Sequence, residues 1–119
     1  MEELAKLHCS PIGANTARLN EHDENQLKAK LPDWQIYEKD AVLRLEKAFE
    51  FKDFRQALAF TNQIAQMSTE EDHHPAILTE WGKVTVTWWT HKIKGLHEND
   101  FIMAAKTEHL YGDLYGSHT

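Results

Sequence analysis

The chain has 119 residues, 41% of them hydrophobic and 10% aromatic, which suits one globular domain and leaves no room for a second. Thirteen Lys and Arg against nineteen Asp and Glu give a formal net charge of −6, and this acidic balance argues against a protein that binds duplex nucleic acid through its phosphates. No apolar run reaches the roughly 20 residues of a membrane helix, and the first residues lack the pattern of a secretory signal. The single cysteine, Cys9, rules out an internal disulfide, so we expect a cytoplasmic protein in a reducing compartment.

The first elements in chain order are a loop, a short helix and two strands. Residues 1–21 show neither helical nor strand periodicity and are predicted to be a loop-like N-terminal extension. Residues 23–31 fit a short helix that a proline ends. A strand from Trp34 to a turn at Asp40 follows. Residues 42–51 then alternate apolar and polar side chains, which predicts a half-buried antiparallel strand.

A longer helix and a hairpin come next. Residues 53–68 carry apolar side chains at helical intervals, and Asp53 with Gln56 forms a capping-box pattern at the start. Two strands are predicted over residues 77–81 and 84–91, with a tight turn at Gly82 between them.

A last helix over residues 99–111 and a flexible tail over residues 112–119 complete the chain. The short turns within each strand pair require antiparallel hairpins. We therefore predict one α+β domain over residues 1–119, in the order α-β-β-α-β-β-α. Its four-stranded antiparallel sheet would carry the helices on one face, as a two-layer sandwich.

Three of the chain's eight histidines, His73, His74 and His91, lie at the ends of the predicted second hairpin. Strand alternation turns the aliphatic residues of its second strand toward the helices and places His91 on the open face or at its rim. His73 and His74 precede the hairpin, and Pro75 favours an extended conformation for His74. The hairpin brings this pair near His91, with Asp100 a short loop away. Unperturbed imidazoles titrate near pH 6.5, so these residues form a candidate acid–base set.

Each of these residues also has a purely structural interpretation. The His-His pair could lie in a solvated loop, and His91 could be a surface residue at a strand end. Asp100 could simply cap the last helix, and residues 70–72 could be a solvated helix end. Tryptophans near the hairpin are more often core or interface residues, which applies to Trp81, Trp88 and Trp89. Two other histidines are predicted to lie on the surface, His97 and His109.

Zinc and a cysteine nucleophile are two further alternatives. Three histidines could make a tetrahedral zinc site with one open position. The chain has no HExxH or comparable spacing, however, and adjacent ligands restrained by proline would chelate one ion poorly, so no metal is predicted. Cys9 could act as a lone nucleophile, but its polar stretch offers no local helper beyond His8.

An ordered set of motifs spans residues 31–110. It consists of Leu31-Pro32-x-Trp34, Phe49-x-Phe51-x-x-Phe54-x-x-Ala57-x-x-Phe60, acidic residues before His73-His74-Pro75, Trp81, Lys83-Val84, Thr90-His91, Gly95-Leu96 and Asp100. In this combination and spacing the chain resembles the pterin-4a-carbinolamine dehydratases, which in animals are also dimerisation cofactors of a homeodomain transcription factor. The resemblance implies the two-layer fold and a homodimer or homotetramer built through helices and sheet edges. It also implies, as an alternative function, a protein-binding coactivator module.

The reaction that the resemblance implies is loss of water from 4a-hydroxytetrahydrobiopterin, which gives the quinonoid dihydropterin without a cofactor and recycles the pterin of aromatic amino acid hydroxylases. The implied pterin-contacting residues are Asp72, His73, His74, Trp89, Thr90, His91 and Lys92. Our hypothesis makes His73 and His91 the acid–base pair and His74 a hydrogen-bonding partner, and leaves open which ring is the acid.

Supporting residues follow from the same resemblance. Asp100 would orient a histidine or cap its helix. The family often has a glutamate four residues before the first histidine of the pair, where this chain has Thr69, so Glu70 or Glu71 is the candidate replacement. His97 stands where the family usually has a Ser or Thr helix cap.

Overall fold

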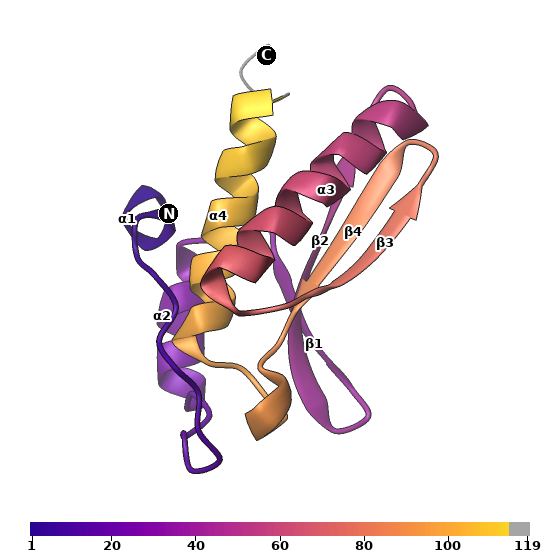
Figure 1. Cartoon of the computed structure of the whole chain (residues 1–119). Coiled ribbons are helices and arrows are strands. Elements are labelled where there is room, and N and C mark those ends of the chain that lie inside the picture. The colour runs from indigo at the N-terminus through magenta and orange to yellow at the C-terminus, as the bar shows by residue number, and fades with distance from the viewer. Residues whose placement is uncertain (115–119) are drawn as a thin grey trace.

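The sheet and its covering helices are the main features of the computed structural model, which describes residues 1–114. Within these residues the chain forms a four-stranded antiparallel sheet in the order β1-β2-β4-β3, with the helices on one face (Figure 1). This confirms the predicted α+β two-layer architecture. The elements are α1 (Glu2–Ala5), α2 (Glu21–Ala29), β1 (Gln35–Lys39), β2 (Val42–Glu50), α3 (Phe54–Glu71), β3 (Ala76–Glu80), β4 (Lys83–Trp88), the 3₁₀ helix η1 (His91–Ile93) and α4 (Glu98–Leu114).

The two hairpins follow from local turn chemistry. Asp40 and Ala41 both have positive φ, 54° and 63°, as a two-residue turn between twisted strands requires. In the second hairpin, Gly82 packs where an added Cβ would lie 3.1 Å from the carbonyl oxygen of Phe51. Long-range pairing of β2 with β4 then joins the two hairpins, with Leu45 opposite Trp88.

Helix α3 begins as its capping pattern predicts. The Asp53 side chain accepts from the backbone N–H of Gln56 at 2.9 Å, and the Gln56 side chain accepts from Lys52 N at 3.1 Å. The helix continues to Glu71, three residues beyond the predicted end. It stops where Asp72 adopts a left-handed conformation with φ 53°.

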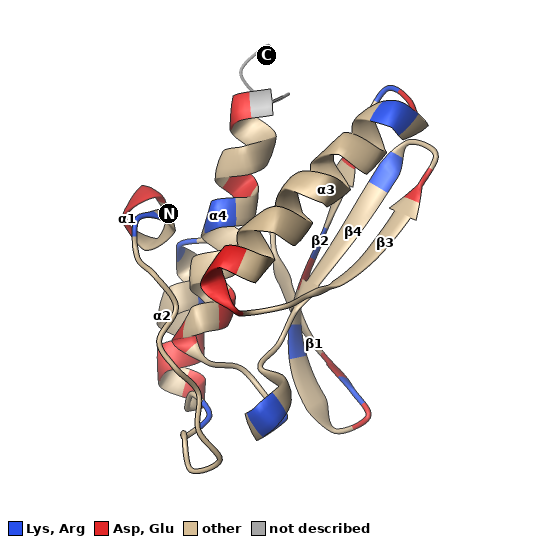
Figure 2. Cartoon of the chain, in the orientation of Figure 1, with Lys and Arg blue, Asp and Glu red and all other residues tan. Residues whose placement is uncertain are grey.

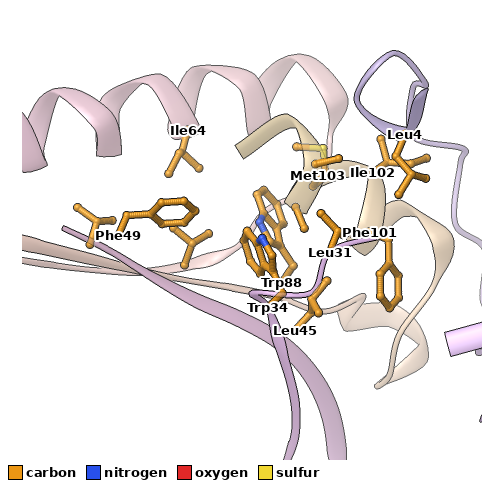
Figure 3. Close-up of a cluster of buried hydrophobic side chains, with 14 of the residues drawn as sticks. Leu4, Leu31, Trp34, Leu45, Phe49, Ile64, Trp88, Phe101, Ile102 and Met103 are labelled. Atoms are coloured by element: carbon orange, nitrogen blue, oxygen red, sulfur yellow. The ribbon is translucent and has the colours of Figure 1, made fainter. Parts of the chain in front are cut away.

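The hydrophobic core lies between the sheet and the helices (Figure 3). Trp34 and Trp88 are 1% and 0% exposed, and burying a large apolar side chain contributes roughly 1.5 to 3 kcal/mol. The alternation predicted for β2 is present, because Leu45 and Phe49 are buried on the helix side. Among residues 1–114, no helix is both long enough and apolar enough to cross a membrane.

The N-terminal extension differs from the predicted loop. It contains helix α1, which packs against α4 and inserts Leu4 into the core at 3% exposure. Helix α2 begins at Glu21, two residues before the predicted start, because the side chain of Asn20 accepts from Asp23 N at 2.8 Å.

The end of the second hairpin and the C-terminus also differ from the prediction. β4 stops at Trp88, so the alternation does not reach His91. Thr90 instead pairs with Gly95 across a short loop that contains η1, and Lys94 closes this loop with a positive φ of 51°. Helix α4 takes in residues 112–114 of the predicted tail, and residues 115–119 lie outside the described part.

Candidate active site

A cavity of about 520 Å³ opens where the end of α3, the β4–η1 junction and the N-terminal segment meet. It is lined by Cys9, Ser10, Pro11, Ile12, Glu71, Asp72, His73, His74, Thr90, His91 and Lys92. Figure 2 shows acidic residues at the C-terminal end of α3 and a basic residue in η1, and the cavity lining includes Glu71, Asp72 and Lys92, so it carries charges of both signs.

The end of α3 determines how the two adjacent histidines enter the site. The left-handed Asp72 turns the chain out of the helix, and the N–H of His73 returns to the carbonyl oxygen of Ser68 at 3.1 Å. The extended segment before β3 then sends neighbouring side chains to opposite sides. As a result His73 is buried, at 7% exposure, while His74 is exposed.

The buried histidine is bonded to a buried carboxylate. His73 Nε2 lies 2.7 Å from Asp100 Oδ1, and the Asp100 side chain is 0% exposed. The imidazole also stacks over Trp88, with ring centroids 6.0 Å apart and planes 14° apart. These contacts fix the ring between the core and the cavity.

The second oxygen of Asp100 ties this pair to the surrounding loops. Asp100 Oδ2 accepts from the Thr90 hydroxyl at 2.8 Å and from His97 N at 3.0 Å. His97 Nδ1 in turn accepts from Asn99 N at 3.0 Å, so a histidine caps α4 where a Ser or Thr was expected. The two sequence interpretations of Asp100, as a positioning group and as a helix-start residue, are therefore both present.

The exposed histidines form the other side of the site. His91 Nε2 lies 3.3 Å from the carbonyl oxygen of His74, and the His91 ring contacts that of Trp89 at 4.4 Å between centroids. Trp89 packs against the hydrophobic core, with the Arg44 guanidinium carbon 4.1 Å from its ring centroid. It is not among the residues that line the cavity, which differs from the pterin contact that the resemblance implies.

The other predicted site residues fall into those that line the cavity and those that do not. Asp72, Thr90 and Lys92 line the cavity, so all three stay candidates for contacts with a pterin. Glu71 lines it too, whereas Glu70 lines a different hollow, beside α1 and α4. Among the predicted surface histidines, His109 is exposed.

Sequence reasoning missed the contribution of the N-terminal segment. Cys9 and the three residues after it line the cavity, although they lie more than 60 positions before the histidines. Burial, reinforced by the charges of Glu71 and Asp100, raises the pKa of the Cys9 thiol to about 12. A thiol that stays protonated is a poor nucleophile, so Cys9 is a wall residue of the cavity. Nothing local in the sequence marks this position.

Metal binding receives no support from the geometry. Among residues 1–114, no group of three or more His, Cys, Asp or Glu side chains is arranged to hold an ion. His73 already directs Nε2 to Asp100, and His91 directs Nε2 to a carbonyl oxygen.

Comparison with known proteins identifies the relationship. A transcriptional coactivator/pterin dehydratase from Brucella melitensis has a similar structure, with TM-score 0.71 and 34% identity over 79% of this chain and 98% of that chain. A pterin dehydratase-like protein described as a RuBisCO assembly factor in the alpha-carboxysome matches with TM-score 0.57 and 27% identity, over 67% of this chain and 90% of that chain. The family model for pterin 4 alpha carbinolamine dehydratase matches residues 17–110, and the chain belongs to that family.

Proposed function

We propose that the protein dehydrates 4a-hydroxytetrahydropterin, such as 4a-hydroxytetrahydrobiopterin, to the quinonoid dihydropterin and water. The observation that carries the proposal is the buried His73–Asp100 pair, at 2.7 Å, in a cavity that two further histidines line. Membership of the dehydratase family supports the same substrate class.

The reaction needs two proton transfers. The C4a–O bond breaks as the hydroxyl leaves with an added proton, as water. The N5–H bond gives up its proton, and its electron pair forms the new C4a=N5 double bond. Each well-placed acid or base typically contributes about 10²- to 10⁴-fold. Two imidazoles on different sides of a flat ring provide both groups without an electron acceptor.

The hydrogen bonds favour His73 as the base. An ionised carboxylate only accepts, so Asp100 holds the proton of His73 on Nε2 and leaves Nδ1 as the acceptor of a neutral ring. The same carboxylate stabilises the imidazolium that forms when the ring takes the N5 proton.

His91 then serves as the acid. Its Nε2 donates to the His74 carbonyl, so a protonated ring has Nδ1–H to give to the departing hydroxyl. Because His91 is exposed, water can return a proton to it after each turnover. His74 and Lys92 provide hydrogen bonds to the polar edge of the pterin.

The test is a dehydration assay with the purified protein and synthetic 4a-hydroxytetrahydropterin. We expect decay of the carbinolamine in proportion to protein concentration, well above the spontaneous rate. Decay at the spontaneous rate at micromolar protein would refute the proposal.

A surface at the other end of the sheet favours a second, protein-binding function. Phe54 and Leu58 on α3 are 45% and 44% exposed, and Trp81 in the β3–β4 turn is 70% exposed. The hydrogen bond from Phe51 N to Gly82 O, 2.9 Å long, brings this turn to the start of α3. Large exposed apolar side chains of this kind mark interaction sites.

We propose that a second copy of this chain binds to this surface, in a homodimer or homotetramer. Phe54→Asp should lower the sedimentation coefficient because it breaks that contact, while the distant cavity keeps its activity. An unchanged coefficient in this variant and in Trp81→Asp would show that the chain does not associate through this surface.

A further inference from the structure

The segment formed by residues 8–12, which we call the N-terminal strap, makes one wall of the cavity. Its residues Cys9 to Ile12 share the cavity with His73, Thr90 and His91. The strap lies before the stretch that matches the family model, which starts at residue 17. The match to the family model does not include the strap, so its place in the site is known from the structure of this chain.

The first attachment of the strap is Glu71, the last residue of α3. Glu71 Oε1 accepts from Cys9 N at 2.8 Å, and Oε2 contacts His8 Nδ1 at 2.8 Å. Partial burial alone would raise the pKa of Glu71, but the hydrogen bonds from Cys9 N–H and His8 outweigh it and lower that pKa below its usual range. The carboxylate is thus held ionised on the strap.

The second attachment is Asn99, next to Asp100 in the chain. The Asn99 side chain accepts from Ser10 N at 2.9 Å and donates to Ser10 O at 2.8 Å. This reciprocal pair satisfies both backbone groups of Ser10, and Asn99 is only 1% exposed. Lys92 Nζ adds a contact to Ile12 O at 3.3 Å.

The chain is also anchored before and after the strap. Before it, Leu4 is buried in the core and Lys106 Nζ donates to Ala5 O at 2.7 Å. After it, Leu19 N donates to Leu96 O at 2.9 Å. Both ends and the middle are therefore tied to α3, α4 and the loop before α4.

The part of the strap that faces the cavity carries no charge. Its lining residues are a cysteine with a raised thiol pKa of about 12, then Ser, Pro and Ile. Such a wall cannot exchange protons with a substrate at neutral pH. It can exclude water from one side of a flat ring and contact that ring.

We propose that the strap is a substrate-binding wall of the pterin site, with Glu71 as its positioning residue. This inference rests on the proposed dehydratase function. His73 and His91 are held by Asp100 and by backbone groups, none of which belongs to the strap. Loss of the strap therefore removes binding shared by ground state and transition state, which raises KM and spares kcat.

The main experiment compares Glu71→Ala with the neighbouring control Glu70→Ala, whose exposed side chain accepts from Gln66 Nε2 at 3.5 Å. In Glu71→Ala we expect KM for 4a-hydroxytetrahydropterin to rise about 5- to 20-fold with kcat within twofold of wild type. The amide of Cys9 should exchange with deuterium faster in this variant, and neither quantity should change in Glu70→Ala.

A second measurement uses no turnover and no substitution. The backbone amide of Cys9 donates to Glu71, so its deuterium exchange reports on the strap directly. Bound 7,8-dihydrobiopterin, a stable analogue of the substrate, should slow this exchange at least fivefold in the wild-type protein.

The outcomes separate the two proposals. Faster Cys9 exchange in Glu71→Ala with an unchanged KM, or a fall in kcat alone, would overturn the inference and leave the dehydratase intact. If Glu71→Ala does not fold, the Pro11→Ala/Ile12→Ala variant replaces it, with the same expected rise in KM. A protein without dehydratase activity would refute the proposed function, and absence of pterin protection at Cys9 would then refute the strap as well.

Discussion

The two sides of the cavity use histidine in different ways. On the inner side, His73 is 7% exposed and bonded to a fully buried Asp100 at 2.7 Å, and Thr90 holds the same carboxylate at 2.8 Å. On the outer side, His91 is exposed and has a 3.3 Å contact with the carbonyl oxygen of His74.

The burial and hydrogen bonding of each histidine indicate which step of the proton transfer it suits. A ring bonded to a buried carboxylate has one tautomer and one orientation, which suits a base that must meet a defined proton. A ring in contact with water can be reprotonated between turnovers. Substitutions on the inner and the outer side should separate these roles.

Removal of the inner imidazole should have the largest effect. His73→Ala should lower the dehydration rate by roughly 10²- to 10⁴-fold, the usual contribution of a positioned acid or base. The measurement is turnover of 4a-hydroxytetrahydropterin, with the exposed His109→Ala as the matched control. A rate within a few-fold of wild type would exclude His73 as the base.

Asp100→Asn should come next. The amide cannot accept on both sides. Its NH2 group faces either His73, where it selects the wrong tautomer, or the Thr90 hydroxyl and His97 N–H, where donors meet. We expect a rate about 10- to 10³-fold lower and a loss of about 1 to 3 kcal/mol in the free energy of unfolding. A turnover assay measures the rate, and urea denaturation measures the free energy of unfolding. The control is Asp113→Asn, at an exposed carboxylate. An unchanged free energy of unfolding would mean that the hydrogen bonds of Asp100 contribute little to stability.

His91→Ala should have a smaller effect on rate and almost none on stability. Water can partly replace an exposed acid, so we expect a loss of about 10- to 10²-fold in kcat. The free energy of unfolding should stay within about 0.5 kcal/mol of the wild-type value, because the His91 side chain is on the surface. A large loss of stability in His91→Ala would contradict the contrast between the two sides.

The smallest effect concerns the pH dependence of the strap. The pKa of Glu71 is lower in the folded state than the ordinary value of about 4.5 that it has in the unfolded chain, so its contribution to stability is present above about pH 4.5. It is lost as the pH falls through the lower folded value. The stability difference between wild type and Glu71→Gln should therefore shrink toward zero in acid, as followed by urea unfolding at several pH values. If the stability difference grew as the pH fell, the ionised form of Glu71 would not be the form that stabilises the fold, which would contradict this prediction.

Much of the fold could be predicted because its signals are local. Alternation along β2 and the Asp53–Gln56 capping pattern act between residues close in sequence. The order of motifs also indicated the site, since His73, His74 and His91 all line one cavity.

The parts that were missed depend on distant contacts. Cys9 N meets Glu71 and Ser10 meets Asn99 across 62 and 89 positions, so no pattern in the first 20 residues could show them. The end of β4 was missed for a similar reason. Thr90 leaves the strand to pair with Gly95 and to donate to Asp100, which places His91 in a 3₁₀ turn.

The most direct test of the central claim is a double-mutant cycle on the buried pair. If Asp100 acts by holding His73, the rate of the His73→Ala/Asp100→Asn protein should equal that of His73→Ala alone, because the carboxylate has no ring left to orient. If the two losses multiply instead, Asp100 and His73 act separately and the pair is not the unit that carries out the proton transfer.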